Sequence, residues 1–281
     1  SDLFGTKLAT GTVCGLEQDV SQALAKPYAE VCEAIPQQTR ISADETGWTE
    51  DKSKAWLWVA CTSVAILFRI ARSRGKAVAK ELIGEGFAGI LTTDRWSGYN
   101  WVAAAQRQLC WAHLLRDMQG MVDRGGVGGG LGRQMLDEVE KMFDWWAELR
   151  DGTLERAAFQ QNMLPVRATV ERLLLAGSTT AEKKTAGMCA EILKLKVALW
   201  TFVDHEGVEP TNNVGERAIR PAVMWRKGCF GTDSERGSRF VERILTTVAT
   251  VRLRGGNVLG YLTAACEAHR RGAVAPSLLG V

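Results

Sequence analysis

The sequence predicts a mixed α/β fold, in which a five-stranded mixed sheet is flanked by helices and interrupted by a helical insertion. Three apolar stretches of strand length lie between residues 40 and 71, and turn residues separate them, as in an antiparallel meander. A helical pattern and another buried strand follow, and such a helix supplies the crossover to a parallel strand. Between residues 120 and 204 no strand pattern interrupts the helical spacing of apolar residues.

Residues 1–36 are expected to be helical, beginning at Gly11 or Thr12 and closed by Pro36. Their apolar face recurs at helical spacing and consists of Val20, Leu24, Tyr28, Val31 and Ile35. Residues 8–16 also have the look of the second half of a helix-turn-helix motif. Only one helix is evident there, and it lacks a basic face for reading bases, so we favour a helix that packs on the next domain.

The strands of the sheet are expected at residues 40–44, 55–62, 65–71, 87–94 and 107–111. Helices separate the last three of them, at residues 75–85 and 98–105. The fourth strand ends on the carboxylate of Asp94. The resulting order, β-β-β-α-β-α-β, is that of a mixed sheet.

A glycine-rich tract at residues 124–132 breaks this pattern. It lacks the Gly-Lys-Ser/Thr ending of a phosphate-binding loop and does not lie directly between a strand and a helix, so we expect a flexible connection. Further helices are expected at residues 133–150, 153–176 and 181–203, from about Ser234, and from the cap residue Asn257 to about Arg271.

Residues 211–221 are expected to form a short helix that opens at Asn213. Pro221 lacks the amide donor that a helix interior needs, so this helix should end or kink near Arg220. Glu216 stands where a carboxylate closes a capping box with Asn213. On local grounds alone, Glu216 is therefore a capping residue.

The composition is that of a globular protein with 281 residues, of which 46% are hydrophobic and 24% charged, enough for one large domain or two modest ones. No apolar run is long enough for a membrane span and no secretory segment opens the chain. The seven cysteines form no plausible disulfide framework, which is typical of the reducing cytoplasm. The net charge is only +3, but residues 211–260 hold nine Arg or Lys against four Asp or Glu, a distribution that suits a polyanionic partner.

Two aspartates, Asp44 and Asp94, stand at or near the ends of predicted strands. If those strands are parallel neighbours, the two carboxylates meet above one edge of the sheet and need a cation between them. Mg²⁺ is the natural one, and a third carboxylate from a packed helix, that of Glu216, completes a two-metal site. The alternative is that each strand-end aspartate caps the following turn.

Seven motifs occur in the order found in one family of bacterial transposases. They are Asp44-Glu-Thr-Gly-Trp48, Thr93-Asp-Arg-Trp-Ser-Gly-Tyr-Asn100, Cys110-Trp-Ala-His113, Pro210-Thr-Asn-Asn213, Glu216-Arg-Ala-Ile-Arg-Pro221, Trp225-Arg-Lys227 and Ser234-Glu-Arg-Gly-Ser-Arg-Phe-Val-Glu242. Over nearly its whole length the chain thereby resembles the insertion sequence 66 family. Full-length members are longer and carry a coiled-coil segment and a cysteine-rich, zinc-binding part before the core, which this sequence does not include.

The resemblance implies a ribonuclease H-like core with a DDE triad, which falls on Asp44, Asp94 and Glu216. It further implies two Mg²⁺ (or Mn²⁺) ions, cut-and-join chemistry on the DNA of element ends and target, and a helical insertion before the catalytic glutamate. The domains expected are an N-terminal helical segment (1–38), the first part of the core (39–119), the helical insertion (120–204) and the completion of the core (205–281). A cytoplasmic, nucleoid-associated homo-oligomer that works with accessory proteins of the element is the corresponding expectation for partners and location.

Three residues near the second aspartate have more than one interpretation. Arg95 replaces the glycine of many relatives, and it either contacts the scissile phosphate or weakens metal binding. Cys110 and His113 form a lone Cys-x-x-His without a second pair at zinc-finger spacing, so a structural zinc is not expected. Both residues suit a buried structural role, but the resemblance favours His113 as a catalytic residue at the rim of the site, against a phosphate.

Basic residues cluster after the predicted catalytic glutamate. Arg236, Arg239 and Arg243 share one face of a predicted helix, opposite an apolar face. A solvated helix face has the same pattern, but the neighbouring basic residues favour contact with DNA phosphates. The predicted DNA-binding set is Arg95, Arg217, Arg220, Arg226, Lys227, Arg236, Arg239 and Arg243. Trp225 has two interpretations, stacking on an unpaired base and packing in the core.

The sequence thus predicts a DDE transposase that cleaves DNA at element ends and transfers the 3′-hydroxyl to a target. A metal-dependent nuclease of the same fold that does not join strands is the first alternative. A catalytically inactive DNA-binding remnant is the second, although the intact triad argues against long decay. A glycosidase with paired carboxylates fits poorly, because arginine-rich surroundings suit phosphates better than neutral sugars.

Overall fold

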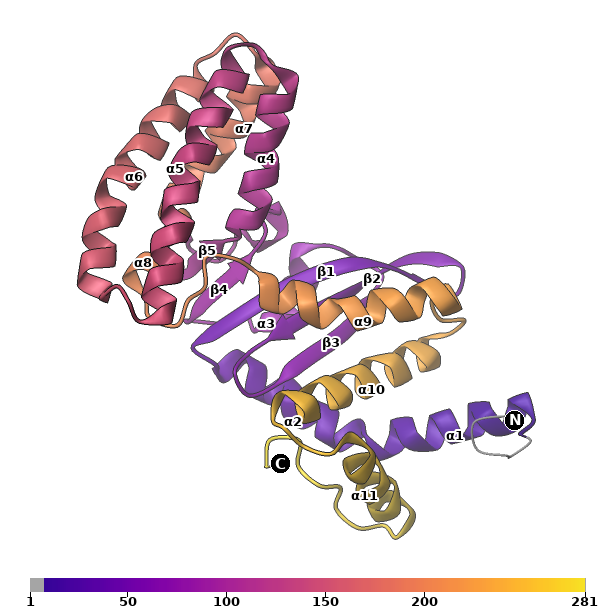
Figure 1. Ribbon diagram of the computed structural model, residues 1–281. Coiled ribbons are helices and arrows are strands. Elements are labelled where there is room, and N and C mark those ends of the chain that lie inside the picture. Colours follow the sequence, from indigo (N-terminus) through magenta and orange to yellow (C-terminus); the bar gives the residue numbers. More distant parts are fainter. Residues whose placement is uncertain (1–7, 281) are drawn as a thin grey trace. The chain divides into compact units, whose positions relative to one another are not determined.

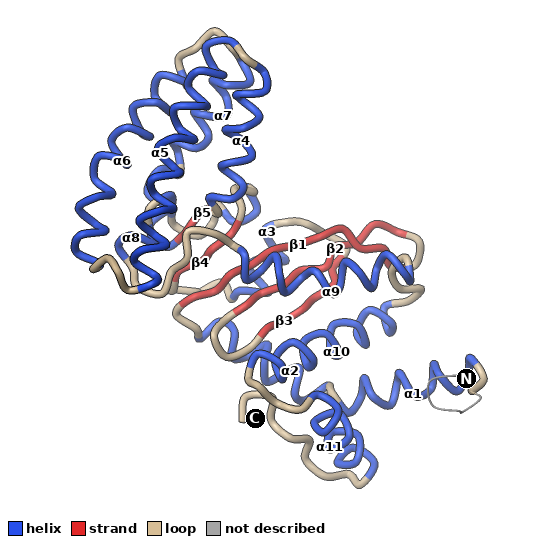
Figure 2. Tube along the Cα trace, in the orientation of Figure 1, coloured by secondary structure: helices blue, strands red, loops and turns tan. Residues whose placement is uncertain are grey.

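The predicted mixed α/β fold is confirmed by the computed structural model, which describes residues 8–280 (Figures 1 and 2). Its strands form a five-stranded mixed sheet in the order β3-β2-β1-β4-β5, consistent with a ribonuclease H-like fold. The strands are β1 (Arg40–Glu50), β2 (Ser53–Cys61), β3 (Ile66–Ala71), β4 (Ile90–Thr93) and β5 (Arg107–Leu109). β1, β2 and β3 pair antiparallel, and β4 and β5 pair parallel.

The described chain divides into two compact units. The first comprises Ser1–Gly89 and Asn213–Val281, apart from the terminal residues outside the described range, and the second comprises Ile90–Asn212. Within residues 8–280, no helix is both long enough and apolar enough to cross a membrane. The four predicted domains are not tested by this division and remain a prediction.

In the first unit, helices α9 (Asn213–Cys229) and α10 (Glu235–Leu253) pack on the antiparallel strands (Figure 1). Alternate residues of β2, including Leu57 and Val59, point into a shared apolar core with Ile219 of α9 and Val241 of α10. This period of two is what a strand with one covered face produces. The core therefore fixes α9 against one face of the sheet.

The outer edge of β3 is closed by polar side chains of α10. Glu242, Thr246 and Thr250 are buried and lie four residues apart along one face of the helix. Each accepts one backbone N–H of the strand: that of Ile70 at 2.6 Å, that of Phe68 at 2.9 Å and that of Ile66 at 3.1 Å. The spacing matches because four helix residues rise about 6 Å and two strand residues about 6.6 Å. An edge that would otherwise be open to pairing with another chain is thereby satisfied.

The hydrogen bonds from β3 to Glu242, Thr246 and Thr250 of α10 depend on pH through Glu242. Its carboxyl is fully buried, and burial raises the pKa from 4.5 to about 7, against the opposing effects of Arg239 and the Ile70 N–H. A folded-state pKa above the unfolded one means that the stability contributed is present below about pH 4.5 and is lost as pH rises through about 7. We expect the free energy of unfolding to fall by roughly 1–3 kcal/mol across this window.

Glu242→Gln keeps an oxygen acceptor for Ile70 but does not titrate. Its urea unfolding curves should therefore lack this fall, and the difference from the unmodified chain should grow steadily between pH 4.5 and 7. Parallel stability curves for the two proteins over that range would contradict a raised pKa at Glu242.

The N-terminal segment is two helices where the sequence predicted one. α1 (Thr10–Ala23) and α2 (Ala25–Ala34) meet at Leu24, and a 3₁₀ turn, η1 (Ile35–Gln37), follows. The break has a local cause: Pro27 has no N–H to donate to the carbonyl of Ala23, and its ring crowds that carbonyl. The part of the predicted helix in residues 1–7 lies outside the described residues.

The predicted helices that follow the third strand, begin near Ser234 and end the chain are confirmed. α3 (Lys76–Ile83) follows β3, and α11 (Val258–Arg270) ends the unit. Ser234 caps α10, since its Oγ accepts the N–H of Gly237 at 3.2 Å. Asn257 caps α11 in the same way.

The second unit packs helices around its own apolar core. They are α4 (Trp111–Arg124), α5 (Gly126–Asp151), α6 (Arg156–Ser178), α7 (Lys183–Lys194) and α8 (Thr201–Asp204), with a 3₁₀ turn, η4 (Lys196–Leu199), between the last two. At the centre of this core, the rings of Trp146, Phe159 and Phe202 lie 5.4–6.0 Å apart, which is normal aromatic packing. The predicted helix at residues 181–203 is wrong in its extent, because α7 stops at Lys194.

Two further predictions for the second unit are wrong. The glycine-rich tract is not a flexible connection, because α5 begins at Gly126 and contains the rest of the tract. Glu182, the residue before α7, accepts the N–H of Gly128 with its Oε2 at 3.0 Å. This hydrogen bond satisfies a free donor in the first turn of α5. The short helix expected at residues 98–105 is replaced by two 3₁₀ turns, η2 (Ser97–Tyr99) and η3 (Ala104–Gln106).

Candidate active site

Asp44 lies in the middle of β1, so its predicted place at the end of a strand is wrong. The strand continues to Glu50, and Asp44 stands directly opposite Val59 of β2. Side chains that face each other across an antiparallel pair point to the same side of the sheet. Because Val59 belongs to the core beneath α9, the Asp44 side chain stands on the face that α9 covers. Asp44 Oδ1 also accepts the backbone N–H of Glu45 at 2.8 Å.

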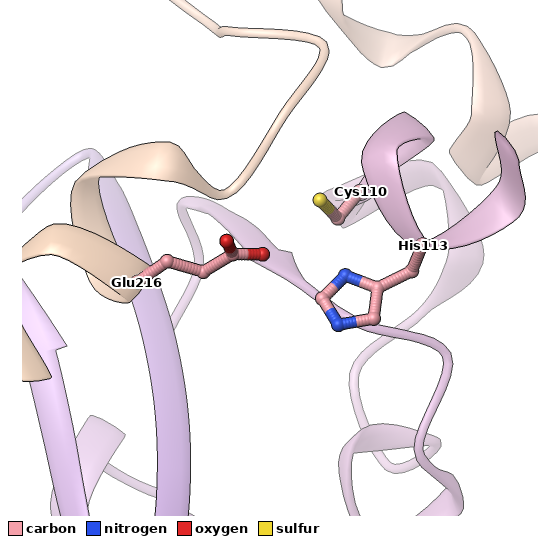
Figure 3. A group of neighbouring side chains, drawn as sticks. All are labelled: Cys110, His113 and Glu216. Carbon is pink, nitrogen blue, oxygen red and sulfur yellow. The ribbon is translucent and has the colours of Figure 1, made fainter. Parts of the chain in front are cut away.

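Glu216 lies in the first turn of α9, and Figure 3 shows its carboxylate extending from that helix. The helix begins at Asn213, so the residue predicted as its cap is the first helical residue. The predicted end near Arg220 is wrong, because α9 runs through Pro221 to Cys229. Pro221 is exposed, whereas Ala222 beside it is buried, so the missing hydrogen bond falls on the side of the helix that water reaches.

The position of α9 along β1 follows from its far end. Arg226 Nη1 donates to Thr46 Oγ1 at 3.2 Å and to the carbonyl of Gly47. Beyond the helix, the N–H of Thr232 donates to the carbonyl of Thr49, so α9 runs in the same direction as β1. From Glu216 to Arg226 the helix rises about 15 Å, which corresponds to between four and five strand residues.

Counting back from Thr46, Glu216 is level with about Ser42 of β1. That is within about two residues of Asp44, on the same face of the sheet. Two of the three predicted catalytic residues, Asp44 and Glu216, thus lie about two residues apart along β1, and their catalytic role stays a prediction.

The thiol of Cys61 is a neighbour of Asp44 in this face of the sheet. Burial, and next the charge of Asp44, raise its pKa to about 12. The thiol is therefore protonated at neutral pH and offers neither a nucleophile nor a thiolate ligand. Oxygen atoms remain the ligands that this part of the sheet presents, which suits a hard cation.

In the second unit, Asp94 follows β4 directly, as predicted. Its Oδ1 accepts the N–H of Trp96 at 2.9 Å, an arrangement that shapes the turn after the strand. The capping alternative for this aspartate is thus present in the structure. An ionised carboxylate accepts several bonds, so this turn leaves capacity for a further ligand.

Arg107 is a buried residue that the sequence did not single out. Its guanidinium bonds Asn100 Oδ1 at 2.8 Å, Thr93 Oγ1 at 3.2 Å and the carbonyl of Asp94 at 3.3 Å. Burial lowers its pKa to about 10, and the nearby charge of Asp94 opposes that shift. Arg107 therefore fixes the end of β4 and the backbone of Asp94. A strand arginine carries no sequence signal for such a role, which depends on the pairing of β5 with β4.

Arg95, Cys110 and His113 also lie in the second unit. Arg95 Nη2 forms an ion pair with Asp117 of α4 at 2.8 Å. Cys110 is buried just before α4 and its Sγ accepts the N–H of Asn212 at 3.1 Å. His113 is half-buried in the first turn of the same helix (Figure 3). The catalytic role of His113 stays a prediction.

The predicted DNA-binding residues of the first unit fall into two groups. The exposed residues are Arg217, Arg220 and Lys227 of α9 and Arg236 of α10. The others bond to the protein itself: Arg226 to β1, Arg239 to Glu242 at 2.8 Å, and Arg243 to the carbonyl of Ser21 at 2.9 Å. The exposed group is free of these structural tasks and is the better placed for a polyanion.

Trp225, for which the sequence left stacking and core packing open, is half-buried and packs against the apolar core of the first unit. Its ring lies edge-on to that of Phe240, with the two ring centres 6.3 Å apart. The alternative interpretation from the sequence, core packing, therefore describes this tryptophan in the structure.

Known proteins resemble the chain in sequence. The family model described as "Transposase IS66 family" matches residues 1–240. The chain is 26% identical over 266 residues to the uncharacterized protein y4qI of Sinorhizobium fredii (strain NBRC 101917 / NGR234), an alignment that covers 83% of the chain and 48% of y4qI. The chain thus spans about half the length of this curated relative. No solved structure matches it.

Proposed function

Because this chain belongs to the IS66 family of transposases, we propose that it is the catalytic part of a DDE transposase. It cleaves DNA at the ends of a mobile element and joins the freed 3′-hydroxyl to target DNA. The proposal is supported by the positions of Asp44 and Glu216, which lie on the same face of the sheet and within about two residues of each other along β1. Carboxylates gathered at one site are typical ligands of a hard divalent cation.

The proposed ligands for the metal are Asp44, Glu216 and Asp94. Their carboxylate oxygens are the donors that Mg²⁺ and Mn²⁺ take, and the protonated Cys61 thiol nearby does not compete for the metal. When bound, a pair of such ions polarises the phosphate and lowers the pKa of the attacking water or hydroxyl. Arg107 supports this site as a positioning residue, because it holds the backbone of Asp94.

The DNA is proposed to lie on the exposed basic residues. Arg217, Arg220 and Lys227 line the outer face of α9, the helix that carries Glu216, and Arg236 follows on α10. Such residues bind phosphates and position a duplex without reading its sequence. Arg226, Arg239 and Arg243 bond within the first unit and support this surface from within. Arg95, in the second unit, stays a proposed DNA contact. His113 is proposed to contact a phosphate at the rim of the site, and we expect a homo-oligomer that holds two DNA ends.

A strand-transfer assay tests this function. The chain is incubated with Mg²⁺, a supercoiled target plasmid and a labelled duplex that carries an element end with its 3′-hydroxyl already exposed. We expect the label to become covalently joined to the plasmid, because a DDE transposase uses that hydroxyl as its nucleophile. A duplex with a 3′-dideoxy end is the control and should give no joined product.

The two alternatives give different results in the same assay. A nuclease of this fold shortens the labelled strand in a metal-dependent way and joins nothing. An inactive remnant binds the duplex, as a gel shift shows, but yields neither product. Either result would overturn the proposal of strand transfer.

A further inference from the structure

Phe230 combines two features that are costly for a folded protein. Its side chain is 80% exposed, and it is the one aromatic among the strongly exposed large apolar side chains of residues 8–280. Its backbone has φ = +62°, in the left-handed region that bulky residues rarely adopt. Backbone strain of this kind gathers at functional sites, where the surrounding structure imposes it.

The segment around Phe230 is held rigidly on both sides. The N–H of Phe230 donates to the carbonyl of Arg226 at 2.7 Å and so closes the end of α9. Two residues later, Thr232 donates its N–H to the carbonyl of Thr49 at 2.9 Å and accepts the N–H of Asp51 at 2.8 Å. These bonds fix the loop to the β1–β2 hairpin, so Phe230 is presented at a defined place.

The residue between these anchors has to be glycine. Gly231 has φ = +118°, and a β-carbon there would collide with the carbonyl oxygen of Thr49. The loop therefore reaches this close contact with β1 only because Gly231 follows Phe230.

The surface leading to Phe230 is basic. Arg217, Arg220 and Lys227 are exposed along the outer face of α9, and Met224 between them is 62% exposed. Glu216, in the first turn, is the helix's only acidic residue. Arg217 and Lys227 are separated by about 15 Å along the helix, the length of four to five base pairs. Phosphates bound along this face would bring bases to the end of α9, where Phe230 stands.

We propose that Phe230 stacks on an unpaired DNA base where the duplex is opened, with the backbone held along the outer face of α9. Aromatic side chains bind the faces of bases in this way without regard to sequence. Stacking then covers the apolar ring. Because the loop is already rigid, little conformational entropy is lost when the base binds. Trp225 is less exposed than Phe230, because it is half-buried and packs edge-on to Phe240. The inference rests on the proposed function, since it assumes a DNA substrate.

Binding to two matched duplexes tests the proposal. One is fully paired, and the other has the same length with 2-aminopurine in a short unpaired segment. We expect Phe230→Ala to weaken binding to the opened duplex about tenfold or more and to leave the paired duplex within about twofold. The unmodified chain should quench the 2-aminopurine fluorescence, and the alanine variant should not. Phe230→Trp should restore both effects.

Two further variants separate stacking from general disturbance. Leu259→Ala removes a 75% exposed apolar side chain from α11 and should change neither affinity. Phe230→Gly relieves the positive φ, so it should raise the melting temperature while it weakens binding to the opened duplex.

Three outcomes would overturn the inference. Equal affinity of Phe230→Ala and the unmodified chain for the opened duplex removes the stacking role. A dimer that becomes a monomer on Phe230→Ala, measured by sedimentation, assigns the ring to a contact between two copies of the chain. Failure of the unmodified chain to bind either duplex contradicts the proposed function itself, which the joining assay detects independently.

Discussion

Glu216→Gln should abolish Mg²⁺-dependent cleavage and joining, with a loss in rate of about 10³-fold or more. The amide has the shape of the carboxylate but not its charge, so it holds a hard cation poorly. Losing one ligand removes several kcal/mol of charge stabilisation in a metal site, and each ~1.4 kcal/mol corresponds to a factor of ten in rate. Asp44→Asn and Asp94→Asn should have the same effect. Single-turnover assays on the labelled element end measure it.

The competing role of Glu216, as a helix cap, predicts a different pattern. Glutamine closes a capping box as glutamate does, so Glu216→Gln would then leave both the melting temperature and the rate per folded molecule unchanged. Glu267→Gln, on the exposed surface of α11, is the matched control and should affect neither quantity. If Glu216→Gln stayed active, the third ligand would have to be another residue.

Elements with local signals were predicted well from the sequence. Asn257 caps α11 as predicted, and the helix expected from about Ser234 begins there with Ser234 as its cap. In both cases the N–H group that the cap bonds lies three residues further on. The extent of β1 was not predictable in this way. Residues 45–50 are mostly polar, and they form a strand because each of them pairs with β2. The turn that makes this pairing possible, Asp51-Lys52, has φ values of 49° and 57° without the glycine that usually marks such hairpins.

Two prolines show why helix ends were harder to predict. Pro27 breaks the N-terminal helix before it, and Pro221 leaves α9 continuous. The same residue type has opposite outcomes because the buried Ile219 and Ala222, on either side of the second proline, bind that helix to the sheet. Tertiary packing decides such cases, and a single sequence does not display it.

The residues of the candidate site also differ in whether their roles depend on local patterns or on tertiary packing. The three carboxylates were predicted from their places in the expected strands and helix and from family motifs, whereas no pattern in the sequence predicts the roles of Arg107 and Glu242. Glu242 and Thr246 are 172 and 178 residues from the strand residues that they bond. A buried glutamate inside a basic helix face resembles a solvated one in sequence. Its partner strand becomes known only from the fold.

Two glycines of α5 test whether this tract is a helix packed on α4, as in the structure, or a flexible connection, as its composition predicted. Gly132 is buried, and a β-carbon there would lie 2.8 Å from the carbonyl oxygen of Met118 and 2.9 Å from Cβ of Met121, both in α4. Gly130 is exposed, with no atom within 4 Å of its would-be β-carbon. The two positions share one helix and one residue type, and they differ in what the side chain would meet.

Gly132→Val should therefore lower the free energy of unfolding by about 3 kcal/mol or more, because overfilling a packed contact forces the two helices apart. Gly132→Ala should also destabilise the protein, although alanine favours a helix. Gly130→Ala should stabilise it by up to about 1 kcal/mol, the difference in helix propensity between the two residues. Urea unfolding of the three variants measures these changes.

The test depends on the free energy of unfolding changing in opposite directions for Gly130→Ala and Gly132→Ala. In a flexible connection, alanine at either position would act mainly by restricting the unfolded chain, and both variants would change stability alike. In a helix pressed against α4, one glycine is a weakness in propensity and the other is a requirement of close contact. Equal responses at the two sites would restore the flexible connection predicted from composition. Opposite responses make the tract the point where α5 is held against α4, and with it the fixed start of the helical unit.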